Sequence, residues 1–163
     1  MNESRHVLSN FPKDYKGNFI CLGDFQSVTD DLLAAGWCGL IVDHKAEAFV
    51  MGRNTSDKVR YLHGPIQSDP HYIQVGSNVW MRGSTLREVL DNFPGPFDAL
   101  IVNLPSIGRD IVCSDATWAF WPKVIVVNAE GREQEITNQT AEHSYIVKRI
   151  ERDAMILVRP EFP

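Results

Sequence analysis

Short apolar runs rich in β-branched residues recur along the chain and alternate with helix-like segments. The clearest of these runs are NFICL at 18–22, CGLIVD at 38–43, FDALIVN at 97–103 and KVIVVN at 123–128. Strands that are apolar along their whole length are typical of parallel sheets covered by helices on both faces. The alternation therefore predicts an α/β fold built on a doubly wound, mostly parallel sheet.

Weaker apolar runs extend this pattern toward the carboxyl terminus. A third strand is predicted at 58–62, and two final strands at 144–150 and 154–160. The connection between the last two is too short for a crossover, so they are expected to form an antiparallel hairpin. The chain thus predicts a seven-stranded sheet, with a small extra strand at 72–75 inside the irregular segment 63–83.

Helix-like segments lie between the predicted strands, and their ends carry recognisable signals. Ser27 is placed to cap the first helix and Gly36 to end it. Ser84 or Thr85 is placed to cap the third. The predicted helices cover 28–36, 45–53, 85–93, 107–120 and 132–140.

Composition places the chain among ordinary globular proteins. Its 163 residues are 44% hydrophobic and 23% charged, which fits one folded domain. We expect this domain to cover 1–163, with 1–16 as a polar N-terminal extension that lacks the apolar stretch of a signal peptide. The net charge of −5 argues against a broad nucleic-acid-binding surface.

The cysteines and the lengths of the apolar runs indicate in which cellular compartment the protein is expected. Cys21, Cys38 and Cys113 are odd in number and lack metal-ligand spacing. Two of them fall in predicted strands, which favours buried thiols in a reducing compartment. No apolar run approaches the length of a membrane span. We therefore expect a cytoplasmic protein that has no metal site and does not cross a membrane.

The first predicted strand ends in a glycine-containing turn. In a doubly wound sheet, ligands bind at the carboxyl ends of the strands, where strand order reverses. Gly23 permits a tight bend there, and the free N–H groups of the following helix favour an anion such as the carboxylate of an amino-acid cofactor. The alternative is a plain strand-to-helix turn capped by Ser27.

The second and fourth strands end in hydrogen-bonding side chains. Asp43 ends the second strand, where a carboxylate can accept two ribose hydroxyls or, alternatively, cap the helix at 45–53. Asn103 ends the fourth strand and offers an acceptor and a donor to a cofactor or a substrate amine. The alternative there is a loop in which Pro105 ends the strand.

The histidines and tryptophans form no ligand pattern by themselves. His44, His63 and His71 are placed to reach the same edge of the sheet, where one of them could act as a general base. A surface role is the alternative for each. The tryptophans are interpreted as packing residues: Trp37, Trp80, Trp118 and Trp121.

Several of these segments, taken together, resemble one enzyme family. They are GWCGLIVDH at 36–44, GSTLREVL at 83–90, FDALIVN at 97–103 and WPKVIVVN at 121–128. In this order, over roughly residues 17–159, they resemble the FkbM-type S-adenosylmethionine-dependent methyltransferases. The resemblance implies a Rossmann-like methyltransferase fold with S-adenosylmethionine as cofactor. The cofactor-binding positions that it implies are Leu22, Gly23, Asp24, Asp43 and Asn103.

The departures from the family pattern fall on these same positions. Cys21 stands where the family has its first acid, and Ser27 where it has its last glycine. Asn103 replaces an acid at the end of the fourth strand. Asp24 replaces an alanine and is placed to take over the contact with the cofactor's amino group.

Two functions follow from this pattern. The first is methyl transfer to a hydroxyl or amine of a small molecule, sugar or nucleotide, for which no residue stands out as the catalytic base. The second is a non-catalytic module with a structural, assembly or regulatory role, in which the cofactor positions have changed while the scaffold is kept. The expected partner is accordingly a small-molecule substrate or another protein.

Overall fold

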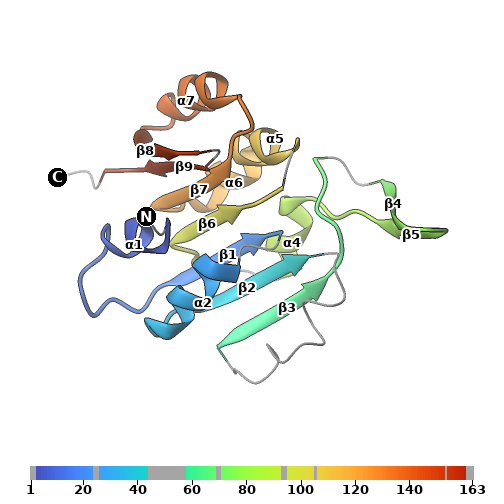
Figure 1. Ribbon diagram of the computed structural model, residues 1–163, viewed down its shortest axis with the longest axis horizontal. Coiled ribbons are helices and arrows are strands. Elements are labelled where there is room, and N and C mark those ends of the chain that lie inside the picture. The colour runs from blue at the N-terminus through green and yellow to red at the C-terminus, as the bar shows by residue number, and fades with distance from the viewer. Residues whose placement is uncertain are drawn as a thin grey trace.

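A seven-stranded sheet organises the part of the chain that the structure, a computed structural model, describes: residues 3–23, 26–43, 58–68, 71–92, 95–104, 106–152 and 154–160. Its strands are β1 (Asn18–Leu22), β2 (Cys38–Asp43), β3 (Val59–His63), β6 (Ala99–Val102), β7 (Val124–Asn128), β8 (Ile146–Glu151) and β9 (Ala154–Val158). They lie in the order β3-β2-β1-β6-β7-β9-β8 (Figure 1). β9 is antiparallel to both of its neighbours, and the other pairs are parallel. The predicted fold class, including the C-terminal antiparallel hairpin, is confirmed.

Helices cover both faces of this sheet. On one face, α1 (Glu3–Leu8) and α2 (Gln26–Ala34) contribute side chains such as Val7 and Leu32 to a buried cluster. The helices on the other face are α4 (Leu86–Asn92), α5 (Gly108–Val112), α6 (Asp115–Phe120) and α7 (Glu133–Ala141).

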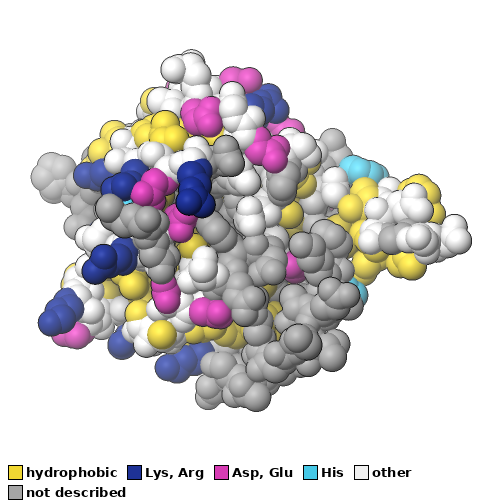
Figure 2. Space-filling model, viewed as in Figure 1, with side chains coloured by type: hydrophobic (Ala, Val, Ile, Leu, Met, Phe, Trp, Pro, Cys, Tyr) yellow, Lys and Arg dark blue, Asp and Glu magenta, His cyan; other side chains and the backbone are white. Residues whose placement is uncertain are grey.

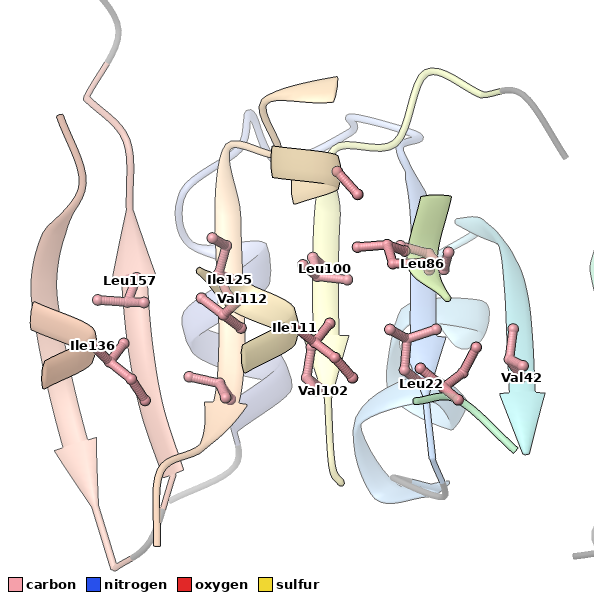
Figure 3. Close-up of a cluster of buried hydrophobic side chains, with 14 of the residues drawn as sticks. Leu22, Val42, Leu86, Leu100, Val102, Ile111, Val112, Ile125, Ile136 and Leu157 are labelled. Atoms are coloured by element: carbon pink, nitrogen blue, oxygen red, sulfur yellow. The ribbon is translucent and has the colours of Figure 1, made fainter. Parts of the chain in front are cut away.

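The strands are buried along their length because both faces of the sheet are covered. In β1, Phe19 and Cys21 belong to the cluster under α1 and α2, whereas Ile20 and Leu22 belong to the cluster under the other helices. Figure 3 shows this second cluster between the sheet and α4, α5 and α7. Each large apolar side chain buried in this way stabilises the fold by about 1.5–3 kcal/mol.

The element at 36–40, Gly-Trp-Cys-Gly-Leu, joins α2 to β2, and its residue types have structural reasons. Gly36 has a φ of +89°, and the N–H groups of Gly36 and Trp37 donate to carbonyls in the last turn of α2, which ends that helix in a Schellman motif. Trp37 is fully buried. A Cβ at Gly39 would lie 2.3 Å from the ring of Phe19, so the missing side chain lets that ring lie across β2.

The helices differ from the sequence-based predictions by more than one residue at three places. α1 lies within 1–16, where only a polar extension is predicted. α2 begins at Gln26, so the prediction that Ser27 caps this helix is wrong. The helix predicted at 107–120 is divided into α5 and α6, because the Ser114 hydroxyl donates to a carbonyl of α5 at 2.7 Å while its backbone is extended. The helix predicted at 45–53 lies outside the described residues.

The predicted small strand is one arm of a hairpin that projects from the molecule (Figures 1 and 2). The hairpin consists of β4 (Tyr72–Gly76) and β5 (Val79–Arg82). Of the two residues proposed to cap α4, Thr85 is the cap: its hydroxyl accepts the Glu88 N–H at 3.2 Å, and its own N–H donates to the Glu88 carboxylate at 3.0 Å. Glu88 also accepts a hydrogen bond from Arg82 at 2.7 Å, which ties the base of the hairpin to α4.

Candidate functional site

Strand order reverses between β1 and β6, because β2 and β3 lie on one side of β1 and the remaining strands on the other. The parallel strands end together at one edge of the sheet, which we call the carboxyl edge. Gly23, Asp43 and Asn103 all lie at this edge, on or just after neighbouring strands. The reversal of strand order is the position at which open α/β sheets bind ligands.

Gly23 fills the narrow space between the ends of β2 and β6. Its N–H donates to the Val42 carbonyl at 2.8 Å, and the Asn103 N–H donates to the Leu22 carbonyl at 2.9 Å. Gly23 has a φ of +83°, and a Cβ there would lie 2.3 Å from the Asn103 carbonyl oxygen and 3.0 Å from Cδ2 of Leu104. The close approach of the β6 end therefore requires glycine at this position.

Asp43 is the acid that the structure places beside this turn. It is 4% exposed, and its carbonyl accepts the Gly64 N–H at 2.8 Å. His63, the last residue of β3, pairs with Asp43 across the sheet, so it lies at the carboxyl edge. His71 precedes β4, and His44 lies outside the described residues. A largely buried carboxylate at the end of β2 can accept hydrogen bonds from hydroxyl groups of a ligand.

The loop after β6 is held to the loop after β7. The Ser106 N–H donates to the Glu130 carboxylate at 2.7 Å, and both residues have positive φ, at 67° and 45°. Asn128 ends β7, and its Oδ1 is buried with no hydrogen-bond partner among the described residues. Sequence reasoning missed Glu130 and Asn128, although an apolar strand followed by polar residues is the same signal that pointed to Asn103.

The remaining predicted cofactor positions differ in what they offer. Leu22 is fully buried in the core, so its side chain is committed to packing. Cys21 is also fully buried, and its thiol donates to the Gly23 carbonyl at 3.2 Å, across the turn. Asp24 lies outside the described residues. The structure therefore brings together Gly23, Asp43 and Asn103 of the predicted set.

The three cysteines differ in exposure, and none of them belongs to a cluster of possible metal ligands in the part of the chain that the structure describes. Burial raises the pKa of Cys113 to about 11, which keeps this thiol protonated near neutral pH. Cys21 is buried as predicted, but Cys38 is exposed as the first residue of β2, so the prediction of a buried thiol there is wrong. No three His, Cys, Asp or Glu side chains of this part come together as metal ligands.

A cavity of about 290 Å³ opens between α4 and the α5–α6 pair. Ser68, Thr85 and Asp115 give its lining a polar side, and Leu86 and Ile111 give it an apolar side. Both apolar residues belong to the buried cluster that also contains the last residues of β1 and β6 (Figure 3). Sequence reasoning did not identify this cavity, because its residues come from three segments that only the fold brings together.

Comparisons with known proteins give a fold but no close relative. No family model matches the chain, and no curated protein matches it. Among solved structures, the chain is similar to MycE methyltransferase from the mycinamycin biosynthetic pathway, in complex with Mg and SAH, with a TM-score of 0.61 and 11% identity over 96% of this chain and 44% of that one. It thus spans less than half the length of MycE.

Two further solved structures agree with the first. The 1,6-didemethyltoxoflavin-N1-methyltransferase of Burkholderia thailandensis, with bound S-adenosylhomocysteine, has a TM-score of 0.55 and 13% identity over 97% of this chain and 76% of that one. Magnesium protoporphyrin IX methyltransferase (ChlM) from Synechocystis, with bound SAM, has a TM-score of 0.57 and 11% identity over the same shares. This is a methyltransferase fold. No helix in the described ranges combines the length and apolar character needed to cross a membrane.

Proposed function

We propose that the chain binds S-adenosylmethionine at the carboxyl edge and transfers its methyl group to a hydroxyl or amine of a small molecule. The observation that carries this proposal is the convergence of Gly23, Asp43 and Asn103 where strand order reverses. The similar solved structures are methyltransferases that hold S-adenosylmethionine or its demethylated product. The element at 36–40 supports the narrower proposal of an FkbM-type enzyme.

The residues at the edge fit the polar groups of this cofactor. Asp43 is a largely buried carboxylate at the end of β2 and would accept the two ribose hydroxyls. Asn103 would accept a hydrogen bond from the amino group through its side-chain oxygen. When bound, the cofactor supplies an electrophilic methyl group on a sulfonium, and the protein supplies position and exclusion of water.

The methyl acceptor is proposed to enter from the side of the cavity between α4 and α5. Its volume of about 290 Å³ suits a small molecule, and its hydroxyl and carboxylate groups can bind hydroxyls or amines. A general base near the acceptor would come from the same edge, where His63 lies beside Asp43.

Two observations favour a non-catalytic module instead. The Asn103 carbonyl and Leu104 occupy the space beside Gly23. The packing of the protein itself therefore explains why this position holds a glycine, without a bound cofactor. The Cys21 thiol at the position of the family's first acid is turned toward the Gly23 carbonyl. In this alternative, the residues of the carboxyl edge stabilise the fold, and a partner protein binds there in place of a cofactor.

Calorimetric titration with S-adenosylmethionine and S-adenosylhomocysteine separates the two functions. We expect binding that Asp43→Asn weakens about 10- to 100-fold, because hydrogen bonds to a charged group contribute about 1.5–3 kcal/mol. The matched control is Asp91→Asn, an exposed acid on α4, which should leave the affinity unchanged. Folded protein that releases no heat with either compound at millimolar concentration would rule out the enzyme and leave the module.

A further inference from the structure

A second cavity lies at the opposite end of the sheet from Gly23. It measures about 650 Å³ and is bounded by α1, by the segment 9–16 and by the end of α2. Trp37, in its lining, precedes β2, so the cavity lies at the end where the parallel strands begin, which we call the amino edge. The volume is within the range of about 300–1,000 Å³ that small-molecule sites occupy.

Aromatic side chains form one wall of this amino-edge cavity. The rings of Phe11 and Tyr15 stack with centroids 5.1 Å apart, and Phe11 meets Trp37 edge-on at 4.8 Å. The Tyr15 hydroxyl and the Asn18 N–H both donate to the Asp98 carboxylate, so this acid is held by the protein at the start of β6. An aromatic wall of this kind favours a flat apolar ligand.

The charged side chains that line the amino-edge cavity are basic. The lining includes Arg5, His6 and Lys13, and no Asp or Glu of the described part of the chain belongs to it. Lys123 adds a further cation, with its Nζ 5.1 Å from the centroid of the Phe11 ring. On the side of the molecule where α1 lies, Figure 2 shows Lys and Arg side chains with Asp and Glu side chains among them, so the positive character is that of the lining itself. The cavity therefore complements a negative charge, although the whole chain carries −5.

Two buried polar atoms of the lining residues have no hydrogen-bond partner within the described ranges. They are Nε1 of Trp37, which is fully buried, and Nε2 of His6. The six-membered ring of Trp37 packs into the space that Gly17 leaves, with Cζ3 2.6 Å from the position of a missing Cβ, so Nε1 lies on the opposite edge of the indole. Both atoms are closed to solvent, so they belong to the packing behind the cavity and not to its open surface.

We propose that the amino-edge cavity binds a small aromatic carboxylate. The flat ring lies along the Phe11 and Tyr15 wall, and the carboxylate accepts hydrogen bonds from the cationic rim of Arg5 and Lys13. This site is separate from the carboxyl edge and does not depend on methyl transfer. It makes the protein responsive to a second small molecule at the opposite end of the same sheet.

The test uses 2-naphthoate as the probe and 2-naphthalenemethanol as its uncharged counterpart, both titrated calorimetrically into the full chain. We expect 2-naphthoate to bind with a submillimolar dissociation constant. The alcohol should bind at least about tenfold more weakly, since one charge-assisted contact corresponds to about 1.4 kcal/mol. Saturating S-adenosylhomocysteine should leave the naphthoate affinity unchanged. Displacement of the probe by that compound would place it at the carboxyl edge and overturn the proposal.

Two variants locate the probe within the cavity. Lys13→Gln should weaken naphthoate binding about tenfold, whereas Lys148→Gln, the same change at an exposed position on β8, should not. Equal affinity of both variants and the unchanged protein, or equal binding of acid and alcohol, would overturn the proposal.

Discussion

The two edges of the main sheet are built from the same strands but differ in chemical character. At the carboxyl edge, Asp43 ends β2, Gly23 and Asn103 follow directly after β1 and β6, and α4 begins with its capping box. At the amino edge, α2 ends at Gly36, and Lys16 donates to the Ala35 carbonyl at 2.8 Å. Polar strand ends and a capped helix start thus lie at one edge, whereas aromatic and basic side chains lie at the other together with the hydrogen-bonded Asp98.

Helix direction explains this difference. In a parallel sheet, each crossover helix begins at the carboxyl edge and ends at the amino edge, so positive helix ends collect at the first and negative ends at the second. Lys16 follows this rule at the end of α2. The same rule makes the amino edge attractive to basic side chains, and these give the cavity there its preference for an anion.

The largest effect on stability is expected from a substitution at the amino edge, and it tests how tightly this edge is packed. Trp37 is fully buried against Phe11 and Tyr15, so Trp37→Ala should lower the free energy of unfolding by about 3–5 kcal/mol. Trp80→Ala is the control, because this side chain is 61% exposed on the hairpin, and it should change stability by about 0.5 kcal/mol or less. Urea denaturation measures both, and similar values would contradict the packing described.

The second prediction tests the close approach at the carboxyl edge. Gly23→Ala should cost about 3 kcal/mol, because a positive φ and a clash with the Asn103 backbone add together. Gly131 also has a positive φ, of 80°, but nothing lies within 4 Å of its added Cβ, so Gly131→Ala should cost about 1 kcal/mol. Equal losses in urea denaturation would show that β6 does not constrain Gly23.

Helix ends at the two edges give a smaller contrast. Thr85→Ala removes the hydroxyl that caps α4 and should cost about 1 kcal/mol. Lys16→Met removes the cation at the end of α2 and should cost about 0.5 kcal/mol, an effect that salt reduces. Thermal unfolding at low and high salt distinguishes them: if Lys16→Met were equally costly at both salt concentrations, the electrostatic account of the amino edge would fail.

The smallest effect is a pH dependence at the base of the hairpin. The Arg82 guanidinium, and then the Thr85 N–H, hold the pKa of Glu88 below its usual range. A lowered pKa means that this stabilisation is present above the ordinary pKa and is lost as the pH falls through the lowered value. The stability gap between the protein and Glu88→Gln should therefore shrink between about pH 5 and pH 3. Urea midpoints at several pH values measure this gap, and a constant gap would contradict the assignment.

The sequence predicted the parts of the fold that rest on local pattern. The apolar runs at 18–22 and 38–43 became strands with unchanged bounds, and the run at 123–128 became β7 one residue shorter, because a strand buried on both faces must be apolar throughout. The prediction failed where contacts from elsewhere decide. Ser27 lies inside α2, and the segment 107–120 is broken at Ser114 by side-chain hydrogen bonds that helix periodicity does not reveal.

The candidate site was predictable only as a set of strand ends. Gly23, Asp43 and Asn103 could be selected because each follows an apolar run, and parallel strands bring such positions to one edge. The strand order that places β1 between β2 and β6 depends on pairing between strands far apart in the sequence, so local patterns could not predict it. The hydrogen bond between Ser106 and Glu130 likewise joins two loops that are distant in sequence.

The sequence by itself determined the α/β class, the strands and the polar groups at their ends, because hydrophobic periodicity and turn chemistry act over a few residues. Only the tertiary structure decided that Gly23 is required by the β6 backbone and that Phe11, Tyr15 and Trp37 gather at the amino edge. Both results depend on packing between segments far apart in the chain. Such packing is selected by the burial of the whole core, and no local pattern records it.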